Sequence, residues 1–157
     1  MNLIFRLAVT EDLPALLQLE EQCFTTDRLN SRSFQWMINR AHGQLLVAQR
    51  GENLVGYAVV LFHRGTSLAR LYSIAIAVQA RGSGLGKQLL ERVEACALEH
   101  DCAYLRLEVR IDNPAAIALY ERNGYRRFAL IHDYYQDHAD ALRLEKRILE
   151  HRASRNI

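Results

Sequence analysis

The segment Arg81-Gly82-Ser83-Gly84-Leu85-Gly86-Lys87 joins a run typical of a buried strand to a pattern typical of a helix. The run before it, residues 71–78, is rich in β-branched and aliphatic residues. After it, apolar residues recur at helical spacing, namely Leu85, Leu89, Leu90, Val93 and Ala97. Glycines at a helix start let an anion approach unpaired backbone N–H groups, where the helix dipole favours negative charge. The segment predicts a phosphate or pyrophosphate site; the alternative is a glycine-rich turn that binds nothing.

Two well-known phosphate loops do not fit this segment. The Walker pattern requires glycine where Arg81 stands and Ser or Thr where Gln88 stands. The dinucleotide pattern G-x-G-x-x-G would require glycine at Lys87. The pattern R-x-x-G-x-G does fit, from Arg81 to Gly86, and it resembles the pyrophosphate loop of the GNAT acyl-CoA N-acyltransferase superfamily.

Composition limits the remaining possibilities. The chain of 157 residues suits one domain, expected over 1–150 and followed by a C-terminal tail, 151–157, with basic residues in and before it. A net charge of +2 with 24% charged residues predicts neither a nucleic-acid nor a membrane partner. No apolar run reaches the roughly 18 residues of a membrane span. The three cysteines form no CxxC pair, which argues against a disulfide framework and against a metal site. Unpaired cysteines favour a cytoplasmic location, and we expect Cys96 to be a packing residue.

The rest of the chain predicts a single α/β domain with a mixed sheet flanked by helices. Strands are expected at residues 3–7, 45–48, 54–62, 71–78, 103–111, 125–131 and 141–148. Four helices are expected. The first covers 13–24 and is capped by Thr10 or Asp12, and the second begins at a cap at Ser31 or Ser33. The third follows the glycine segment, and the fourth follows Asn113.

The last of these helices has clear end signals. Asn113 is a good N-cap, Pro114 suits the first helical position, and Gly124 ends the helix. In the strand before it, alternation places Leu105, Leu107, Val109 and Ile111 on one face and Arg106, Glu108 and Arg110 on the other.

This strand and helix resemble one branch of the superfamily, the ribosomal-protein-alanine and related protein N-terminal acetyltransferases. The matching residues are Leu105-Arg106-Leu107-Glu108-Val109-Arg110, Asn113, the block 116–121 and Gly124-Tyr125, at the spacing of that branch. Residues 133–141 also resemble its late tyrosine-rich loop. The resemblance runs from about Phe5 to Lys146 and implies a GNAT-like sheet splayed at its middle strands.

Three departures from the branch pattern stand out. Val78 replaces a frequent proline before the glycine segment. His138 replaces a usual glycine, from which we expect the late loop to turn differently. The segment Cys23–Ser33, which borders the acceptor site in this family, lacks the usual aromatic and proline residues and leaves the acceptor open.

The resemblance assigns residues to the cofactor, acetyl-CoA, which is a co-substrate. It implies that backbone N–H groups from Arg81 to Lys87 bind the pyrophosphate, and that the Ile76, Ala77 and Val78 backbone holds the pantetheine arm and acyl carbonyl. The pyrophosphate residues are Arg81, Gly82, Ser83, Gly84, Leu85, Gly86 and Lys87. Asn113 is implied as a CoA contact, with a plain N-cap as the equal alternative.

It also assigns catalytic and acceptor residues. Tyr120 is implied as the acid that protonates the departing thiolate, or else it is a core tyrosine. Glu108 is implied as the base, directly or through water, or else it is an exposed carboxylate paired with Arg106 or Arg110. Tyr134 and Tyr135 are implied at the acceptor mouth, or else they pack on the end of the sheet.

The expected activity is acetyl transfer to a primary amine within a ternary complex. A peptide α-amine with a pKa of about 7.7–8.0 needs less help to lose its proton than a lysine near about 10.4. A protein or peptide N-terminus is therefore the favoured acceptor. The alternatives are a small amine and a CoA-binding module without catalysis, while a nucleotide hydrolase fits least. A monomer or weak homodimer is expected.

Overall fold

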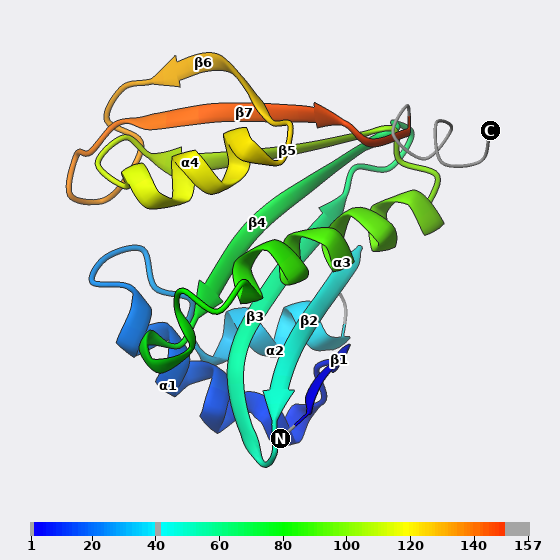
Figure 1. The fold of residues 1–157 in the computed structure, drawn as a ribbon, viewed down its shortest axis with the longest axis vertical. Helices are drawn as coiled ribbons and strands as arrows, with labels where there is room; N and C mark the ends of the chain where they lie inside the picture. The colour runs from blue at the N-terminus through cyan, green and yellow to red at the C-terminus, as the bar shows by residue number, and fades with distance from the viewer. Residues whose placement is uncertain (1, 40–41, 150–157) are drawn as a thin grey trace.

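The computed structural model describes residues 2–39 and 42–149, which leaves the predicted tail outside the described part of the chain. As the sequence predicted, these residues form one α/β domain with a mixed sheet (Figure 1). The sheet has seven strands in the order β1-β2-β3-β4-β5-β7-β6. The strands are β1 (Leu3–Leu7), β2 (Gly43–Arg50), β3 (Asn53–Phe62), β4 (Leu68–Ile76), β5 (Tyr104–Arg110), β6 (Arg126–Ile131) and β7 (Ala141–Arg147). The α-helices are α1 (Leu13–Cys23), α2 (Ser31–Asn39), α3 (Leu85–Glu99) and α4 (Pro114–Arg122).

The sheet opens between its two parallel strands. β4 and β5 pair only from Leu68 with Tyr104 to Leu71 with Leu107, and beyond this point the two strands diverge (Figure 1). All other neighbouring strands are antiparallel. The expected splay at the middle strands is therefore confirmed.

A β-bulge in β4 lies where the opening begins. Opposite β3, Leu71 pairs with Val60 and Ser73 pairs with Val59, so Tyr72 is the extra residue. A bulge residue shifts the alternation of side chains between the faces of a sheet. As a result, Arg70 and Ser73 face the same side, although they are three positions apart and would face opposite sides in a regular strand.

Two helices cover each face of the sheet. Tyr57 of β3 meets α1 through Glu20, and its ring packs edge-on against Phe34 of α2 at 5.5 Å. The neighbouring Gly56 faces the opposite side, where a Cβ would lie 3.0 Å from Leu89 of α3. Helix α4 lies beside α3, since a Cβ on Gly86 would lie 3.1 Å from Leu119.

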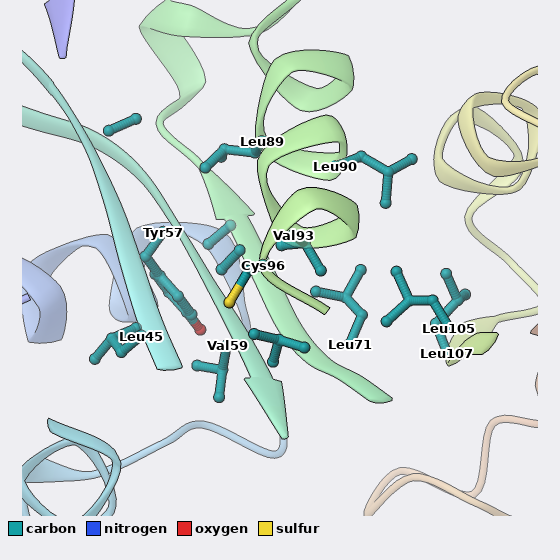
Figure 2. Close-up of a cluster of buried hydrophobic side chains, with 14 of the residues drawn as sticks. Leu45, Tyr57, Val59, Leu71, Leu89, Leu90, Val93, Cys96, Leu105 and Leu107 are labelled. Carbon is teal, nitrogen blue, oxygen red and sulfur yellow. The ribbon is translucent and has the colours of Figure 1, made fainter. Parts of the chain in front are cut away.

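The core lies between the sheet and these helices. Figure 2 shows part of it, with buried α3 side chains beside buried side chains of the strands. Cys96 and Cys102 are buried, so the packing role expected for Cys96 is confirmed. Labelled members are Leu45, Tyr57, Val59, Leu71, Leu89, Leu90, Val93, Cys96, Leu105 and Leu107.

Local signals predicted α4 closely. The Asn113 side chain accepts a hydrogen bond from the Ala116 N–H at 3.2 Å, Pro114 opens the helix, and Gly124 follows it with a φ of 94°. For α2 the expected caps were wrong. The side chain of Asn30, rather than Ser31 or Ser33, accepts the Ser33 N–H at 2.9 Å.

Three other local expectations also change. β4 ends at Ile76, and Val78 begins a turn of 3-10 helix, Val78–Ala80, instead of ending the strand. Asp12 precedes α1 without capping it, because its carboxylate accepts the Val9 N–H and pairs with Arg6. Ile111 lies beyond the end of β5 and is exposed rather than buried.

Candidate active site

A cavity of about 730 Å³ occupies the opening between β4 and β5. Its walls come from the end of α1 and the segment after it, from β4, β5 and α4, and from the loop between β6 and β7. Four of the residues assigned to chemistry or substrate, Glu108, Tyr120, Tyr134 and Tyr135, line this one cavity. Asn113 lines it as well.

Glu108 sits in the cavity wall as an ion-paired carboxylate. Its Oε1 accepts from Arg70 Nε at 2.8 Å and also from the terminal nitrogen of Arg70, and its Oε2 accepts from Arg143 Nε at 2.9 Å. The side chain is 7% exposed. Its expected partners, Arg106 and Arg110, pair instead with Glu145 and with Asp112 and Asp137. The alternative of an exposed carboxylate paired with Arg106 or Arg110 is therefore wrong.

The two late tyrosines extend this cluster. The Tyr134 hydroxyl accepts from Arg70 at 2.8 Å and donates to Glu108 at 3.4 Å. The Tyr135 ring packs edge-on against Tyr134 at 5.0 Å, with the Arg110 guanidinium 4.9 Å from its centroid. Both rings are thus held at the cavity wall by neighbouring charges.

Tyr120 presents a hydroxyl to the cavity from α4. The residue is 5% exposed, its ring packs edge-on against Tyr125 at 5.9 Å, and burial raises the pKa of its hydroxyl above the ordinary value. Within residues 2–39 and 42–149 this hydroxyl has no hydrogen-bond partner, whereas every fully buried polar side-chain atom there has one. The hydroxyl therefore reaches open space, and it carries its proton at neutral pH, as a tyrosine of ordinary pKa also does.

The glycine segment forms an open cradle of backbone N–H groups. The first bond inside α3 runs from the Gln88 N–H to the Gly84 carbonyl at 3.2 Å, so the N–H groups of residues 85–87 have no acceptor in the helix. Gly82 and Gly84 have φ of 78° and 84°, and a Cβ on either would meet nothing within 4 Å. This arrangement fits a pyrophosphate, although the segment does not itself line the cavity.

The backbone at the end of β4 lies between the cradle and the cavity. The Ile76 carbonyl accepts from Cys23 Sγ at 3.3 Å and from Arg81 Nε at 3.1 Å. The Ala77 N–H donates to the Val55 carbonyl, and the Val78 N–H donates to the side chain of Gln22 at 3.2 Å. The Ile76 carbonyl and the Ala77 and Val78 N–H groups thus already have partners, and a pantetheine arm that uses them must displace these bonds.

Hydrogen bonds join two segments whose residues line the cavity. The Asp27 N–H donates to the Gln136 side chain at 2.9 Å, and the Gln136 N–H donates to the Asp27 carboxylate at 3.2 Å. This Asp27–Gln136 bridge connects the α1–α2 segment to the β6–β7 loop. His138 in that loop has a φ of 70°, so it keeps the conformation that a glycine favours. The expectation that the loop turns differently from that of the branch stays a prediction.

Four residues of this region escaped the sequence analysis. Arg70, Arg143, Ser73 and Glu20 belong to the site or to its contacts, and a signal was present for Glu20. Glu20 follows Leu16 by four residues, so it falls on the apolar face of α1, and it is 2% exposed. A charged residue at a core position is the informative kind of exception.

Among the described residues, no group of three or more His, Cys, Asp or Glu side chains is placed to hold a metal ion. None of the helices found in that part of the chain is long and apolar enough to cross a membrane.

Comparisons with known proteins agree with this geometry. The model of the acetyltransferase (GNAT) family matches residues 13–125. An uncharacterized N-acetyltransferase of Methanocaldococcus jannaschii is 30% identical over 146 residues, which are 92% of each chain. The ribosomal-protein-S18-alanine N-acetyltransferase of Escherichia coli superposes with a TM-score of 0.83 at 26% identity over 94% of each chain. The ribosomal-protein-alanine N-acetyltransferase of Brucella melitensis gives 0.79 at 28% identity, over 92% of this chain and 99% of that one.

Proposed function

This chain belongs to the acetyltransferase (GNAT) family and is an N-acetyltransferase, and we propose that it moves an acetyl group from acetyl-CoA to the α-amine of a protein or peptide. The observation that carries the proposal is the cavity at the parting of β4 and β5. One wall presents the Tyr120 hydroxyl, and the other walls carry the charged groups of the acceptor side.

The charges around the cavity suit a cationic acceptor. Its lining includes four carboxylates, Glu20, Asp27, Glu108 and Asp112, and two guanidiniums, Arg70 and Arg110. Both guanidiniums are already paired with carboxylates. The remaining negative field attracts an ammonium group, the protonated form in which an amine arrives.

The proposed reaction is direct transfer within a ternary complex. The neutral amine attacks the thioester carbonyl, a new C–N bond forms, and the C–S bond breaks. Tyr120 gives its proton to the departing thiolate of CoA, and a base takes the proton that the amine loses. The cradle at residues 81–87 holds the pyrophosphate, and Asn113 adds a contact from the start of α4.

An acyl-cysteine intermediate has little support. Cys23 lines the cavity, but burial raises the pKa of its thiol and its Sγ donates to the Ile76 carbonyl. A raised pKa keeps the group as a thiol, while the thiolate is the nucleophile. Attack by the amine itself is the simpler course.

The choice of an α-amine over a lysine rests on proton chemistry and on the resemblance to two ribosomal-protein-alanine N-acetyltransferases. An α-amine loses its proton about 2–3 pH units below a lysine side chain and so needs less help. The Asp27–Gln136 bridge also supports a small-amine acceptor, because it ties together two segments whose residues line the cavity. A cytoplasmic monomer or weak homodimer stays a prediction.

The acceptor is tested with two matched peptides that each contain one lysine, one with a free and one with an acetyl-blocked N-terminus. Release of the CoA thiol should be at least about tenfold faster with the free N-terminus, because the α-amine is neutral in far larger fraction near pH 7.5. Mass spectrometry should place the acetyl group on the α-nitrogen.

A polyamine and a free amino acid serve as further acceptors in the same assay. Equal or faster transfer to the blocked peptide would contradict the α-amine assignment. Transfer to the small amines with none to either peptide would favour the small-amine alternative, and CoA binding without transfer to any amine would favour the binding-module alternative.

A further inference from the structure

The buried carboxylate of Glu20 has no role in the reaction as described so far. It reaches the cavity from α1 and is 2% exposed. Its Oε1 accepts from the Tyr57 hydroxyl, and its Oε2 accepts from the Leu29 N–H at 2.7 Å. Both donors are neutral groups. Burial raises the pKa of this carboxyl above its ordinary value, although both hydrogen bonds oppose the shift.

The hydrogen bonds that Glu20 accepts fix the direction of the next bond in the chain. An ionised carboxylate only accepts hydrogen bonds, so the Tyr57 hydroxyl must donate its single proton to Glu20. The Tyr57 oxygen lies 2.9 Å from Ser73 Oγ, and Ser73 must therefore donate in that bond. The lone pairs of Ser73 are then left to accept another proton. Because Ser73 lines the cavity, that acceptor faces the place where an amine would bind.

The chain Ser73–Tyr57–Glu20 and Glu108 lie on one face of the sheet. Arg70 is opposite Leu61, Ser73 is opposite Val59, and alternation along β3 puts both residues on the side of Tyr57. Pairing of Arg70 with Arg106 carries the same face onto β5, where Glu108 follows two residues later. An amine in the cavity could therefore meet either carboxylate system.

The two systems differ in their capacity to take a proton. Both oxygens of Glu108 accept from cations, since Arg70 and Arg143 each form an ion pair with it. Glu20 has neutral hydrogen-bond donors and a buried site that disfavours its charge. Protonation relieves the cost of burying the charge of Glu20, whereas the oxygens of Glu108 are already engaged by two guanidiniums.

We propose, on the basis of the proposed function, that Ser73, Tyr57 and Glu20 form a relay that takes the proton lost by the acceptor amine. The amine gives a proton to Ser73 Oγ, Ser73 gives its own proton to the Tyr57 oxygen, and Tyr57 gives its proton to Glu20. Both hydroxyls end with one proton each, Glu20 ends neutral, and the nitrogen, once its bond to the acetyl carbon has formed, is left as a neutral amide. Glu108 then positions Arg70, Arg143 and Tyr134 around the acceptor.

The relay makes a pH-dependent prediction. The ionised form of Glu20 is the acceptor, so the rate falls as pH falls through the pKa of its carboxyl. Three ionisable side chains act on Glu20. The positive charge of Arg28 favours the ionised carboxylate, and Tyr57 donates a hydrogen bond to it. The charge of Glu20 in turn helps to raise the pKa of the Cys23 thiol. The same acceptor amine is used with every variant. Its own titration then contributes equally to each pH–rate profile, and differences between the profiles come from the enzyme.

The test uses three single variants of the full chain: Ser73→Ala, Tyr57→Phe and Glu20→Gln. Each breaks one link, and Ser73→Ala leaves the Glu20 bonds to Tyr57 and Leu29 in place. We expect each to lower kcat at saturating acetyl-CoA by at least about tenfold, since loss of general base catalysis typically costs about 10²–10⁴-fold. The affinity of Ser73→Ala for CoA should match the wild type, and the variant should stay folded with only the loss of its one hydrogen bond to Tyr57.

Three further variants sharpen the readout. Ser73→Thr keeps a hydroxyl and should restore the rate. The double variant Ser73→Ala/Tyr57→Phe should be no slower than the slower single variant, because one broken link already interrupts the relay. Glu108→Gln should keep the ascending limb of the pH–rate profile that Glu20→Gln changes.

Loss in only one or two of the three single variants, or losses that multiply in the double variant, would overturn the relay. Loss in Glu20→Gln alone would assign that residue to holding the Leu29 backbone. The wild-type rate is measured first and tests the proposed function separately. A wild type inactive on all amines would overturn both proposals, whereas an active wild type matched by its variants would overturn the relay alone.

Discussion

The Tyr120→Phe variant should lose about 10²–10⁴-fold in kcat while it keeps its affinity for acetyl-CoA. The substitution removes the proton that we assign to the departing thiolate and leaves the buried ring in place. Because the Tyr120 hydroxyl has no hydrogen-bond partner within the described residues, its removal breaks no bond that stabilises the fold. Steady-state thiol release gives the rate, and calorimetry with CoA gives the affinity.

Tyr125→Phe is the matched control for this variant. Tyr125 is the aromatic neighbour of Tyr120 and is equally buried, but its hydroxyl donates to Glu94 at 2.8 Å and does not line the cavity. We expect it to lose about 1.5–3 kcal/mol of stability and to keep its kcat. An unchanged kcat in Tyr120→Phe would make Tyr120 a core residue and leave the thiolate without this acid.

The Gly84→Val variant should bind CoA at least about a hundredfold more weakly. Gly84 has a φ of 84°, a conformation that a β-branched residue strains to adopt. Its missing Cβ also leaves open space above the N–H groups at the start of α3. A valine there would fill the cradle and turn the N–H groups away from a pyrophosphate. The measurement is the dissociation constant of CoA.

Gly65→Val separates the effect on binding from backbone strain. Gly65 lies in the turn between β3 and β4, with a φ of 74° and equally open space around its Cβ position. Both variants should lose a similar amount of stability, and only Gly84→Val should lose CoA affinity. An equal affinity for CoA in Gly84→Val and the wild type would remove the pyrophosphate from this cradle.

The parts of the fold that sequence predicted best depend on local chemistry. The cap at Asn113, the proline after it and Gly124 each act within a few residues, and α4 begins and ends where they indicate. The glycine segment likewise precedes a helix at Leu85. The alternation in β5 placed Leu105, Leu107 and Val109 in the core, because one face of that strand is covered by helices.

The parts that sequence did not predict depend on strand register and distant partners. Glu108 pairs with Arg70 and Arg143, which lie 38 and 35 residues away, so their approach follows from the order of β4, β5 and β7. The bulge at Tyr72 turns Ser73 toward the cavity, and no local sequence pattern predicted this bulge. His138 keeps a left-handed backbone while its side chain contacts Asp133 at 2.6 Å.

The glycine segment predicted the cradle, and the family resemblance, which short continuous segments carry, implied the role of Tyr120. The residues that we place around the acceptor include Glu20 and the Asp27–Gln136 bridge. Asp27 and Gln136 lie 109 residues apart in the sequence. The acceptor is accordingly the property that needs direct measurement.

The most direct measurement is the affinity for two conjugates in which CoA is joined through an acetyl bridge to one peptide. The first conjugate is linked at the peptide's α-nitrogen, and the second at the side chain of its lysine. If the cradle and the cavity together hold CoA and an N-terminus, the first should bind at least about tenfold more tightly than CoA alone, because both halves bind as one molecule. The second should bind no more tightly than CoA. Tighter binding of the lysine-linked conjugate, or equal binding of both conjugates and CoA, would contradict the account.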